Sequence, residues 1–333
     1  MLLTYATAQL LCKLDNSDRV TYVFFAPEGI APEYLFANDK IKSLTASHAI
    51  VVKRTDKYKI TSLQPGVFCE INILLTNEKK INVITLTNQE ALDSWKSTIS
   101  GKERLFICSG DIIFPENKVR IQSTGNPVIS FSIYPAINEL KVDNVKEVAG
   151  EKNGLFESYH ILLPEKKINA IIEKESDNQG STVTPLEKIL ELQRGKTVKY
   201  PNTLQRPGPQ YGALFTPIKS FPSWKVSIPS DAMNGLSDAF IKIDYIGDTG
   251  EAYANGKLIA DDFYAGLPMT IGLKRFSKQL TGKSFQFQVV PLTDERAIYF
   301  EKGIRDPLKG KTIAVLKKVE IIPQYEVMIS TGK

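Results

Sequence analysis

The sequence predicts an all-β protein with two antiparallel, jelly-roll-like β-sandwich domains and two short helices. Apolar and polar residues alternate with period two along several segments, which places one face of each strand in a core and the other in water. Turn signals such as Asn255-Gly256 separate these segments at short intervals, as in β-sandwiches. A repeated strand–helix–strand rhythm is absent, which excludes a (β/α)₈ barrel and a doubly wound sheet. The alternating segments include 129–133, 241–245 and 285–289.

The alternation divides the chain into three regions. Residues 1–140 are predicted to form the first β-sandwich domain, and residues 213–333 the second, jelly-roll-like one. Between them, residues 141–212 are rich in charged and polar residues and end in a segment rich in Pro and Gly. We therefore expect this middle region to connect the domains and to contain only short strands and one helix.

Two segments carry the start signals of helices. Thr87 and Glu90 have the spacing of a capping box, in which each side chain satisfies a free N–H at the helix start. This predicts a short helix that includes Trp95. A second helix is predicted from Thr184-Pro185 to about Arg194, because Pro favours the first helical position and Gly195 the position after the last.

Composition limits the classes of partner. The 333 residues include 42 Lys and Arg against 37 Asp and Glu, and the net charge of +5 is scattered along the chain. Proteins that bind nucleic acid usually show a clustered basic surface, so a nucleic-acid partner is disfavoured. Apolar runs are shorter than the roughly 18 residues that cross a bilayer, so we expect no membrane partner.

The first twelve residues are better explained as a strand than as a secretion signal. A basic start is missing, and Thr4, Tyr5, Thr7 and Gln9 interrupt the apolar stretch. A chain that opens inside a strand leads us to expect further protein upstream. The three cysteines, Cys12, Cys69 and Cys108, lie in strand-like runs without metal-binding spacing, and we expect buried free thiols.

Signatures of catalysis are absent. The sequence has no GxSxG elbow and no HExxH motif, and Gly282-Lys283-Ser284 lacks the preceding glycine of a phosphate-binding loop. The two histidines, His48 and His160, have no neighbouring ligand pattern, so structural roles are expected for both. No catalytic residue and no cofactor are predicted.

Carboxylates are the one catalytic possibility that sequence leaves open, because a glycosidase needs only two of them at the correct separation. The loop acids Asp248, Asp261 and Asp262 would also suit a structural Ca²⁺ ion, since calcium takes oxygen ligands. Most of the candidate acids lie in turn-like segments, where their carboxylates are expected to accept hydrogen bonds from nearby backbone N–H groups. The candidates are Glu28, Glu33, Asp244, Asp248, Glu251, Asp261 and Asp262.

Aromatic residues suggest a carbohydrate site. Sugar rings stack on exposed aromatic faces, and the second domain offers Trp224, Tyr253 and Tyr264, with Phe263 beside the last. Core packing is the competing explanation for each of them, and for Trp224 above all. We predict a carbohydrate-binding site formed by Trp224, Tyr253, Asp261, Asp262 and Tyr264.

The pair Asn255-Gly256 lies between the strand-like segments EAYA and KLIA. A two-residue type I′ hairpin turn requires positive φ at both central residues, and Asn followed by Gly adopts this conformation at low cost. The pair therefore predicts architecture and not a catalyst.

The segment FIKIDYIGDTGEAYANGKLIADDFYAGLPMTIGLKRF, residues 240–276, resembles the C-terminal jelly-roll region of bacterial family 35 glycoside hydrolases, the β-galactosidase-like enzymes, particularly those of Bacteroides type. Further similar segments are TYATAQLLCKLD, NVITLTNQEALDSW and IAVLKKVEIIPQYEVMI. In that family, two glutamates of an N-terminal barrel carry catalysis, and no residue here matches them. The resemblance implies a galactose-binding-like accessory region, a catalytic barrel as partner, and a periplasmic or extracellular location.

Three functions therefore remain open at this point. The first is a non-catalytic accessory region of a β-galactosidase-like hydrolase that supports a barrel and contacts carbohydrate. The second is a free-standing carbohydrate-binding protein. The third is a glycoside hydrolase that uses an unrecognised pair of carboxylates.

Overall fold

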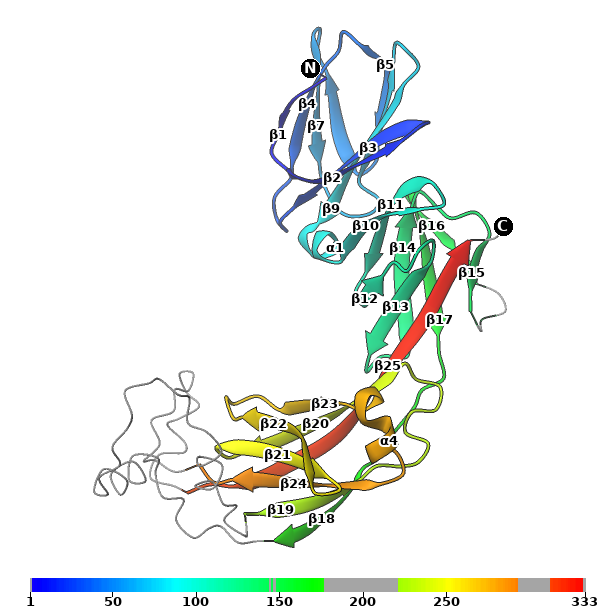
Figure 1. Cartoon of the computed structure of the whole chain (residues 1–333). Coiled ribbons are helices and arrows are strands. Elements are labelled where there is room, and N and C mark those ends of the chain that lie inside the picture. Colours follow the sequence, from blue (N-terminus) through cyan, green and yellow to red (C-terminus); the bar gives the residue numbers. More distant parts are fainter. Residues whose placement is uncertain (1, 144, 146–147, 177–220, 293–311, 332–333) are drawn as a thin grey trace, which may run out of the picture. The chain divides into compact units, whose positions relative to one another are not determined.

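The computed structural model describes all residues except 1, 144, 146–147, 177–220, 293–311 and 332–333. The chain splits into two compact units (Figure 1): unit 1 comprises Met1–Glu165 and Tyr325–Lys333, and unit 2 comprises Lys166–Gln324. Strands dominate both units and helices are few and short. The predicted all-β class is confirmed.

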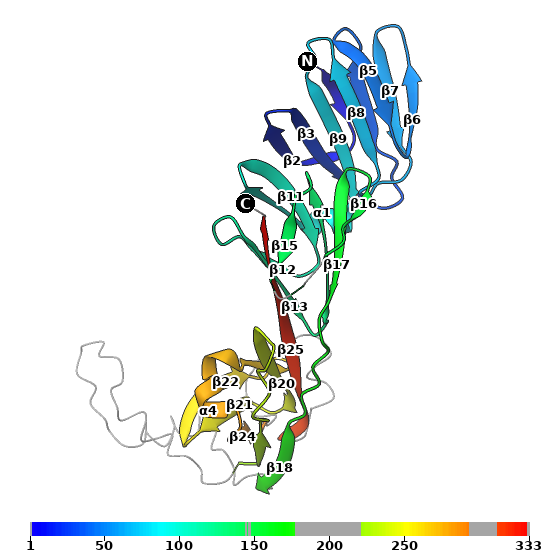
Figure 2. The ribbon, with the colours of Figure 1, turned by 90° about the vertical axis from the view of Figure 1, so that its right-hand side faces the viewer.

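The N-terminal part of unit 1 consists of two sheets, with strand orders β1-β4-β7-β6 and β2-β3-β9-β8-β5. Figure 2 shows β6, β7, β8 and β9 together at this end of unit 1. The strands are β1 (Leu3–Ala6), β2 (Gln9–Asn16), β3 (Arg19–Ala26), β4 (Glu33–Ala37), β5 (Ile41–Ala46), β6 (Ala49–Lys53), β7 (Lys57–Ser62), β8 (Glu70–Leu75) and β9 (Lys80–Thr87).

These two sheets pack face to face around one core, to which Phe24, Tyr34, Ile60 and Ile73 belong. Most pairs of neighbouring strands are antiparallel, as expected, but β3 and β9 pair in parallel from Arg19 with Lys80 to Ala26 with Thr87. Five strands, β4 to β8, lie between β3 and β9 along the chain, and a connection of this length permits parallel pairing.

The remainder of unit 1 contains a sheet with the order β10-β11-β14-β17-β16, and a second one in which β12 and β13 lie beside the end of β25. The short strand β15 pairs with the end of β25. The elements are α1 (Asn88–Leu92), β10 (Ser94–Ile99), β11 (Lys102–Cys108), β12 (Asp111–Ile113), β13 (Val119–Thr124), β14 (Val128–Tyr134), β15 (Leu140–Val142), β16 (Glu151–Asn153), β17 (Phe156–Leu162) and β25 (Val315–Thr331).

A buried cluster and a polar network join these two parts of unit 1. Leu14 and Ile84 from the first part pack with Leu105 and Phe156 from the second. In the same region the Tyr134 hydroxyl lies 2.8 Å from the Thr21 hydroxyl and accepts a hydrogen bond from the Asn82 amide at 3.1 Å. Buried polar groups that are satisfied in this way fix the relative position of the strands that carry them.

Unit 2 is a two-layer sandwich. One layer has the strand order β18-β19-β24-β21-β22, and the other consists of β23, β20 and the first part of β25. The elements are β18 (Ile171–Ser176), β19 (Ser223–Ser227), β20 (Asp238–Ile246), β21 (Thr249–Ala254), β22 (Lys257–Phe263), β23 (Met269–Gly272), the 3₁₀ helix η1 (Lys274–Phe276), α4 (Ser277–Leu280) and β24 (Ser284–Val290).

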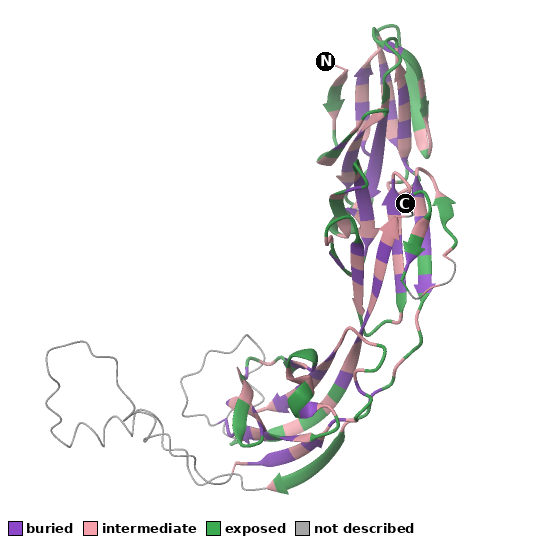
Figure 3. Cartoon of the chain, turned by 45° about the vertical axis from the view of Figure 1, so that its right-hand side comes forward, coloured by how far each residue is buried: buried purple, intermediate pink, exposed green. Residues whose placement is uncertain are grey.

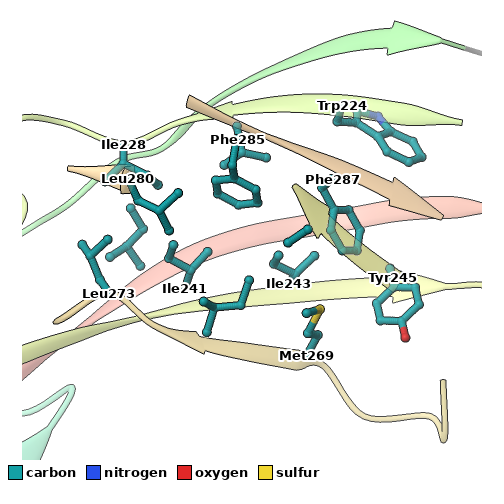
Figure 4. Packing of buried hydrophobic residues seen from close by; sticks show 14 of the residues in the cluster. Trp224, Ile228, Ile241, Ile243, Tyr245, Met269, Leu273, Leu280, Phe285 and Phe287 are labelled. Carbon is teal, nitrogen blue, oxygen red and sulfur yellow. The ribbon is translucent and has the colours of Figure 1, made fainter. Parts of the chain in front are cut away.

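The core of unit 2 fills the space between the two layers (Figure 4). Phe285 and Phe287 of β24 meet Ile241 and Tyr245 of β20, with Trp224 of β19 beside them. Buried and less buried residues alternate along the strands, as Figure 3 shows by its bands of colour. One face of each layer therefore packs in the core, and the opposite face points away from it.

The boundaries of the units differ from the predicted domains. Unit 1 continues beyond residue 140 to Glu165, and it also includes the chain end from Tyr325. The long strand β25 pairs with β20 in its first part and with β15 near its end. An uninterrupted strand gives no sequence signal where its partners change, which explains why the alternation did not reveal this division.

The capping box predicted at Thr87 and Glu90 is confirmed, because both reciprocal hydrogen bonds are present. The helix that it starts ends at Leu92, so the placement of Trp95 on this helix was wrong. Trp95 lies on β10, opposite Phe106. The helix predicted from Thr184 to Arg194 lies outside the described residues, and α4 was not predicted.

The hairpin turn at Asn255-Gly256 is confirmed, since both residues have positive φ, of 51° and 72°. Cys12, Cys69 and Cys108 are free thiols, as expected, and Cys69 and Cys108 are buried. Burial raises the pKa of the Cys69 and Cys108 thiols. A raised pKa keeps them in the unreactive thiol form.

Gly250 of β21 provides a test of the packing in unit 2. A Cβ atom at this position would lie 2.8 Å from the Tyr245 ring and 2.9 Å from the Phe287 ring. Both rings are buried and cannot move away. We expect Gly250→Ala to lower the free energy of unfolding by about 1–3 kcal/mol, measured by urea denaturation. Gly272→Ala is the matched control, because its new Cβ would meet no atom closer than 3.6 Å, and an equal loss there would contradict this explanation.

Candidate functional site

The candidate site is the outer face of the sheet β18-β19-β24-β21-β22, the face that points away from the core of unit 2. In β19, β21 and β24 its residues alternate with buried ones, so the packing of Trp224, Phe285 and Phe287 inside determines what lies outside. We define this outer face by its residues, which are Glu173, Glu175, Ser223, Lys225, Ser227, Thr249, Glu251, Tyr253, Asp261, Phe263, Ser284, Gln286 and Gln288.

Strand register arranges these side chains in rows across the sheet. One row runs Ser223, Gln288, Glu251 and Asp261 over four neighbouring strands. The next row runs Glu173, Lys225, Gln286 and Tyr253. Residues that face each other across antiparallel strands have Cβ atoms about 4.5–5.5 Å apart. The rows therefore form a closely spaced patch of amides, carboxylates and one aromatic ring.

Tyr253 supplies the aromatic ring of this patch, and a hydrogen bond fixes the position of its hydroxyl. The hydroxyl donates a hydrogen bond to Oε2 of Glu251 at 2.6 Å, and the Gln288 amide donates to the same oxygen at 3.3 Å. Glu251 precedes Tyr253 by two residues on the same face, a separation of roughly 7 Å along a strand. To reach it, the Tyr253 side chain leans along β21.

A second network lies beside the first. The Gln286 amide donates to Glu175 at 3.1 Å and to the Ser223 hydroxyl at 3.4 Å. Lys225 forms an ion pair with Glu173 at 3.2 Å. Side chains that are held by their neighbours lose less entropy when a ligand binds, so these networks prepare the outer face for a polar ligand.

The outer face is hollowed where these networks meet. A depression of about 720 Å³ lies there, and it extends from Glu175 on one edge to the Asn255-Gly256 turn. Small-molecule sites typically have volumes of about 300–1,000 Å³. Its lining residues are Glu175, Lys225, Tyr253, Asn255, Gly256, Ser284, Phe285, Gln286 and Gln288.

The environment of Tyr253 keeps its hydroxyl protonated. Burial, followed by the hydrogen bond and negative charge of Glu251 and by the charge of Asp261, raises the pKa of Tyr253 to about 12. All of these effects disfavour the phenolate. The phenol therefore remains a hydrogen-bond donor to Glu251 throughout the physiological pH range.

The structure separates the five predicted carbohydrate-binding residues. Tyr253 and Asp261 lie on the outer face, as the site requires. Trp224 and Tyr264 are each only 8% exposed and pack in the core, so neither ring is accessible for stacking, and their assignment to the site is corrected. Asp262 points inward, where its backbone carbonyl and its carboxylate accept hydrogen bonds from the Tyr245 hydroxyl, both at 2.9 Å.

The remaining acidic candidates lie apart from this face. Glu33 forms an ion pair with Lys59 at 2.7 Å in unit 1. Asp244 lies 3.5 Å from Lys317, and Asp248 is buried. Within the part of the chain that the structure describes, no group of three or more His, Cys, Asp or Glu side chains could hold a metal ion. The structural calcium site stays a prediction.

The two histidines lie in unit 1 and outside the candidate site. The His48 ring nitrogen is 3.3 Å from the Phe68 carbonyl, and its ring lies beside that of Phe68. The His160 ring nitrogen is 2.9 Å from the Ser130 hydroxyl across a strand pair.

Sequence reasoning did not assign Lys225, Gln286 or Gln288 to a site. The alternation already placed the two glutamines on the water-exposed face of their strand. What it lacked was the order of the strands, which brings β19 and β24 beside β21. Of the described helices, none is long and apolar enough to cross a membrane.

The chain matches no protein-family model and no curated protein. Solved structures with some similarity include the mixed-linkage glucan utilization locus protein SGBP-B of Bacteroides ovatus, in complex with a mixed-linkage heptasaccharide, at 9% identity and a TM-score of 0.20; the match covers 92% of this chain and 95% of that one. Another is the GH31 alpha-xylosidase of Xanthomonas citri, at 9% identity and a TM-score of 0.16, covering 97% of this chain and 38% of that one. At these TM-scores, neither likeness bears on the fold or function of this chain.

The raised pKa of Tyr253 predicts a pH effect on stability. Unfolded tyrosine has a pKa of about 10, so between about pH 10 and 12 the folded protein binds more protons than the unfolded chain. The stability that Tyr253 contributes is full below pH 10 and is lost as the pH rises through 12. The fall in the free energy of unfolding over this range, measured by urea denaturation, should therefore be smaller in Tyr253→Phe.

Phe263→Ala provides the control, because it alters the same face without changing a titratable group. It should keep the full pH dependence of the wild type. A Tyr253→Phe protein with an unchanged pH dependence would contradict the hydrogen bond between Tyr253 and Glu251.

Proposed function

We propose that this chain binds carbohydrate on the outer face of unit 2 and that it does not catalyse a reaction. The observation that carries the proposal is the position of Tyr253 on the outer face, next to Glu251, Gln286 and Gln288. C–H groups of a sugar ring pack on an aromatic face, while amides and carboxylates donate to and accept from its hydroxyls. Both kinds of contact are available in one depression.

The finer proposal is that this chain is an accessory region of a β-galactosidase-like glycoside hydrolase, with a catalytic barrel as its partner and a periplasmic or extracellular location. The resemblance of residues 240–276 supports it. That segment includes β21, the Asn255-Gly256 turn and β22, which form one side of the outer face. A free-standing carbohydrate-binding protein would use the same face.

One observation keeps a hydrolase as a second candidate. Glu251 and Asp261 are directly opposite each other in the pair of β21 and β22. Retaining glycosidases place their two carboxyl groups about 5–5.5 Å apart, and residues opposite each other in a sheet lie at a similar separation. This pair is therefore the one to examine if the isolated chain hydrolyses a glycoside.

Replacing Tyr253 tests the binding proposal. We expect Tyr253→Ala to weaken glycan binding at least about tenfold, a loss of about 1.4 kcal/mol, because the stacking surface is removed. Binding is measured by affinity electrophoresis and by glycan array with the whole chain. Tyr5→Ala, which removes an exposed tyrosine of unit 1, is the matched control and should bind as the wild type does. Equal binding by both variants would place the sugar elsewhere.

An activity assay separates the two candidates. The purified chain should hydrolyse an aryl β-galactoside no faster than a heat-killed control. Hydrolysis that is lost in Glu251→Gln and in Asp261→Asn would overturn the non-catalytic proposal, because these substitutions remove the carboxylates and preserve the side-chain shape.

A further inference from the structure

Phe263 is the most exposed aromatic side chain of the outer face, and the proposed function does not explain it. It lies at the end of β22 and is 77% exposed. Its partner across the strand pair is Thr249. Asp262, the residue before it, points into the core toward Tyr245, so Phe263 points outward like Asp261. Exposure of so large an apolar surface is costly, and a ligand that covers it would relieve this cost.

We propose that the outer face binds an uncharged oligosaccharide that runs along β21, with Tyr253 and Phe263 as two separate stacking platforms. This inference rests on the proposed function, and it adds the length and the charge class of the ligand.

The spacing of the two platforms sets the length. Phe263 is level with Thr249, and Thr249 precedes Tyr253 by four residues on the same strand. Four residues of a strand span roughly 13 Å along the backbone. The Tyr253 side chain leans toward Glu251, so its ring lies closer to Phe263 than this span. We therefore take about three consecutive sugar residues as the length that contacts both platforms.

The space between the platforms is polar. Glu251 lies midway between Thr249 and Tyr253, and its row across the sheet contains Gln288 on one side and Asp261 on the other. A middle sugar residue would meet these amide and carboxylate groups with its hydroxyls. Two hydrophobic ends and a hydrogen-bonding centre match a glycan chain better than they match a compact metabolite.

The charges of the outer face exclude acidic glycans. Among the described residues that define it, four are acidic, namely Glu173, Glu175, Glu251 and Asp261, and Lys225 is the one basic residue. The lysine is already paired with Glu173. A uronic acid or a sulfated sugar would place further negative charge beside these groups without a free cation to balance it, which selects for neutral ligands.

Titration calorimetry of the whole chain tests the length. The probes are neutral galacto-, gluco- and manno-oligosaccharides, each from monosaccharide to hexasaccharide. For the sugar series that binds best, we expect the tetrasaccharide to bind at least about tenfold more tightly than the disaccharide, because only the longer chain reaches both platforms. Phe263→Ala should remove this rise in affinity, so that the tetrasaccharide binds no more tightly than the disaccharide.

Phe68→Ala, which removes an exposed phenylalanine of unit 1, is the matched control and should preserve the rise. Failure of every neutral probe to bind would overturn the proposed function together with this inference. Binding that Tyr253→Ala abolishes, but that does not depend on chain length or on Phe263, would overturn this inference alone.

Oligogalacturonides of the same lengths test the charge class. We expect them to bind at least about tenfold more weakly than the neutral chain that binds best. Asp261→Asn should reduce this difference in affinity, because it removes one negative charge that repels the acidic sugar. Acidic chains that bind as tightly as neutral ones would overturn the selection for uncharged ligands.

Discussion

The register of the sheet β18-β19-β24-β21-β22 is the constraint on which the rest of unit 2 depends. A slip of one residue in β24 would turn Phe285 and Phe287 outward and Gln286 and Gln288 inward. Each phenylalanine would lose about 1.5–3 kcal/mol of burial, and each unpaired amide would cost about 1–3 kcal/mol. The sum approaches the roughly 5–15 kcal/mol that stabilises a whole domain. The core therefore fixes the composition of the outer face.

Tyr245 of β20, which belongs to the opposite layer, also determines which residues lie on the outer face. Tyr245 crosses the core and donates to Asp262, and its ring packs against the position where Gly250 has no side chain. β21 and β22 are thus held at the same point by one buried side chain. Because Asp262 is held inward, its neighbours Asp261 and Phe263 point outward. The positions of two residues of the proposed site follow from a contact on the opposite side of the sheet.

The sequence predicts the class of fold and one face of each strand, because alternation is a local signal. The alternation of Phe285 and Phe287 with Gln286 and Gln288 suffices to place the glutamines outside. In 223–227 the same rule pairs Trp224 with Val226 on the inner face, so its burial was readable from the sequence. In β22 the run of Ala260, Asp261 and Asp262 has no clear alternation, and the sequence could not decide which acid faces the core.

The order of the strands is not a local signal. β19 lies beside β24, and β24 beside β21, although the paired residues are 33 to 65 positions apart along the chain. The candidate site combines residues of these three strands with residues of β18 and β22, so its composition required the structure. The same reason accounts for the boundary of the units, since the two ends of β25 have partners from different parts of the chain.

The arrangement of Glu251 and Asp261 favours binding over hydrolysis. A glycosidase needs one carboxyl group that remains protonated near neutral pH, and enzymes achieve this by shielding the group from water in an apolar pocket. Asp261 is exposed on an edge strand, and Glu251 accepts hydrogen bonds from Tyr253 and Gln288. In the part of unit 2 that the structure describes, the depression on this face is lined mainly by polar residues. Such a surface suits the proposed role, in which a sugar is held by many modest contacts.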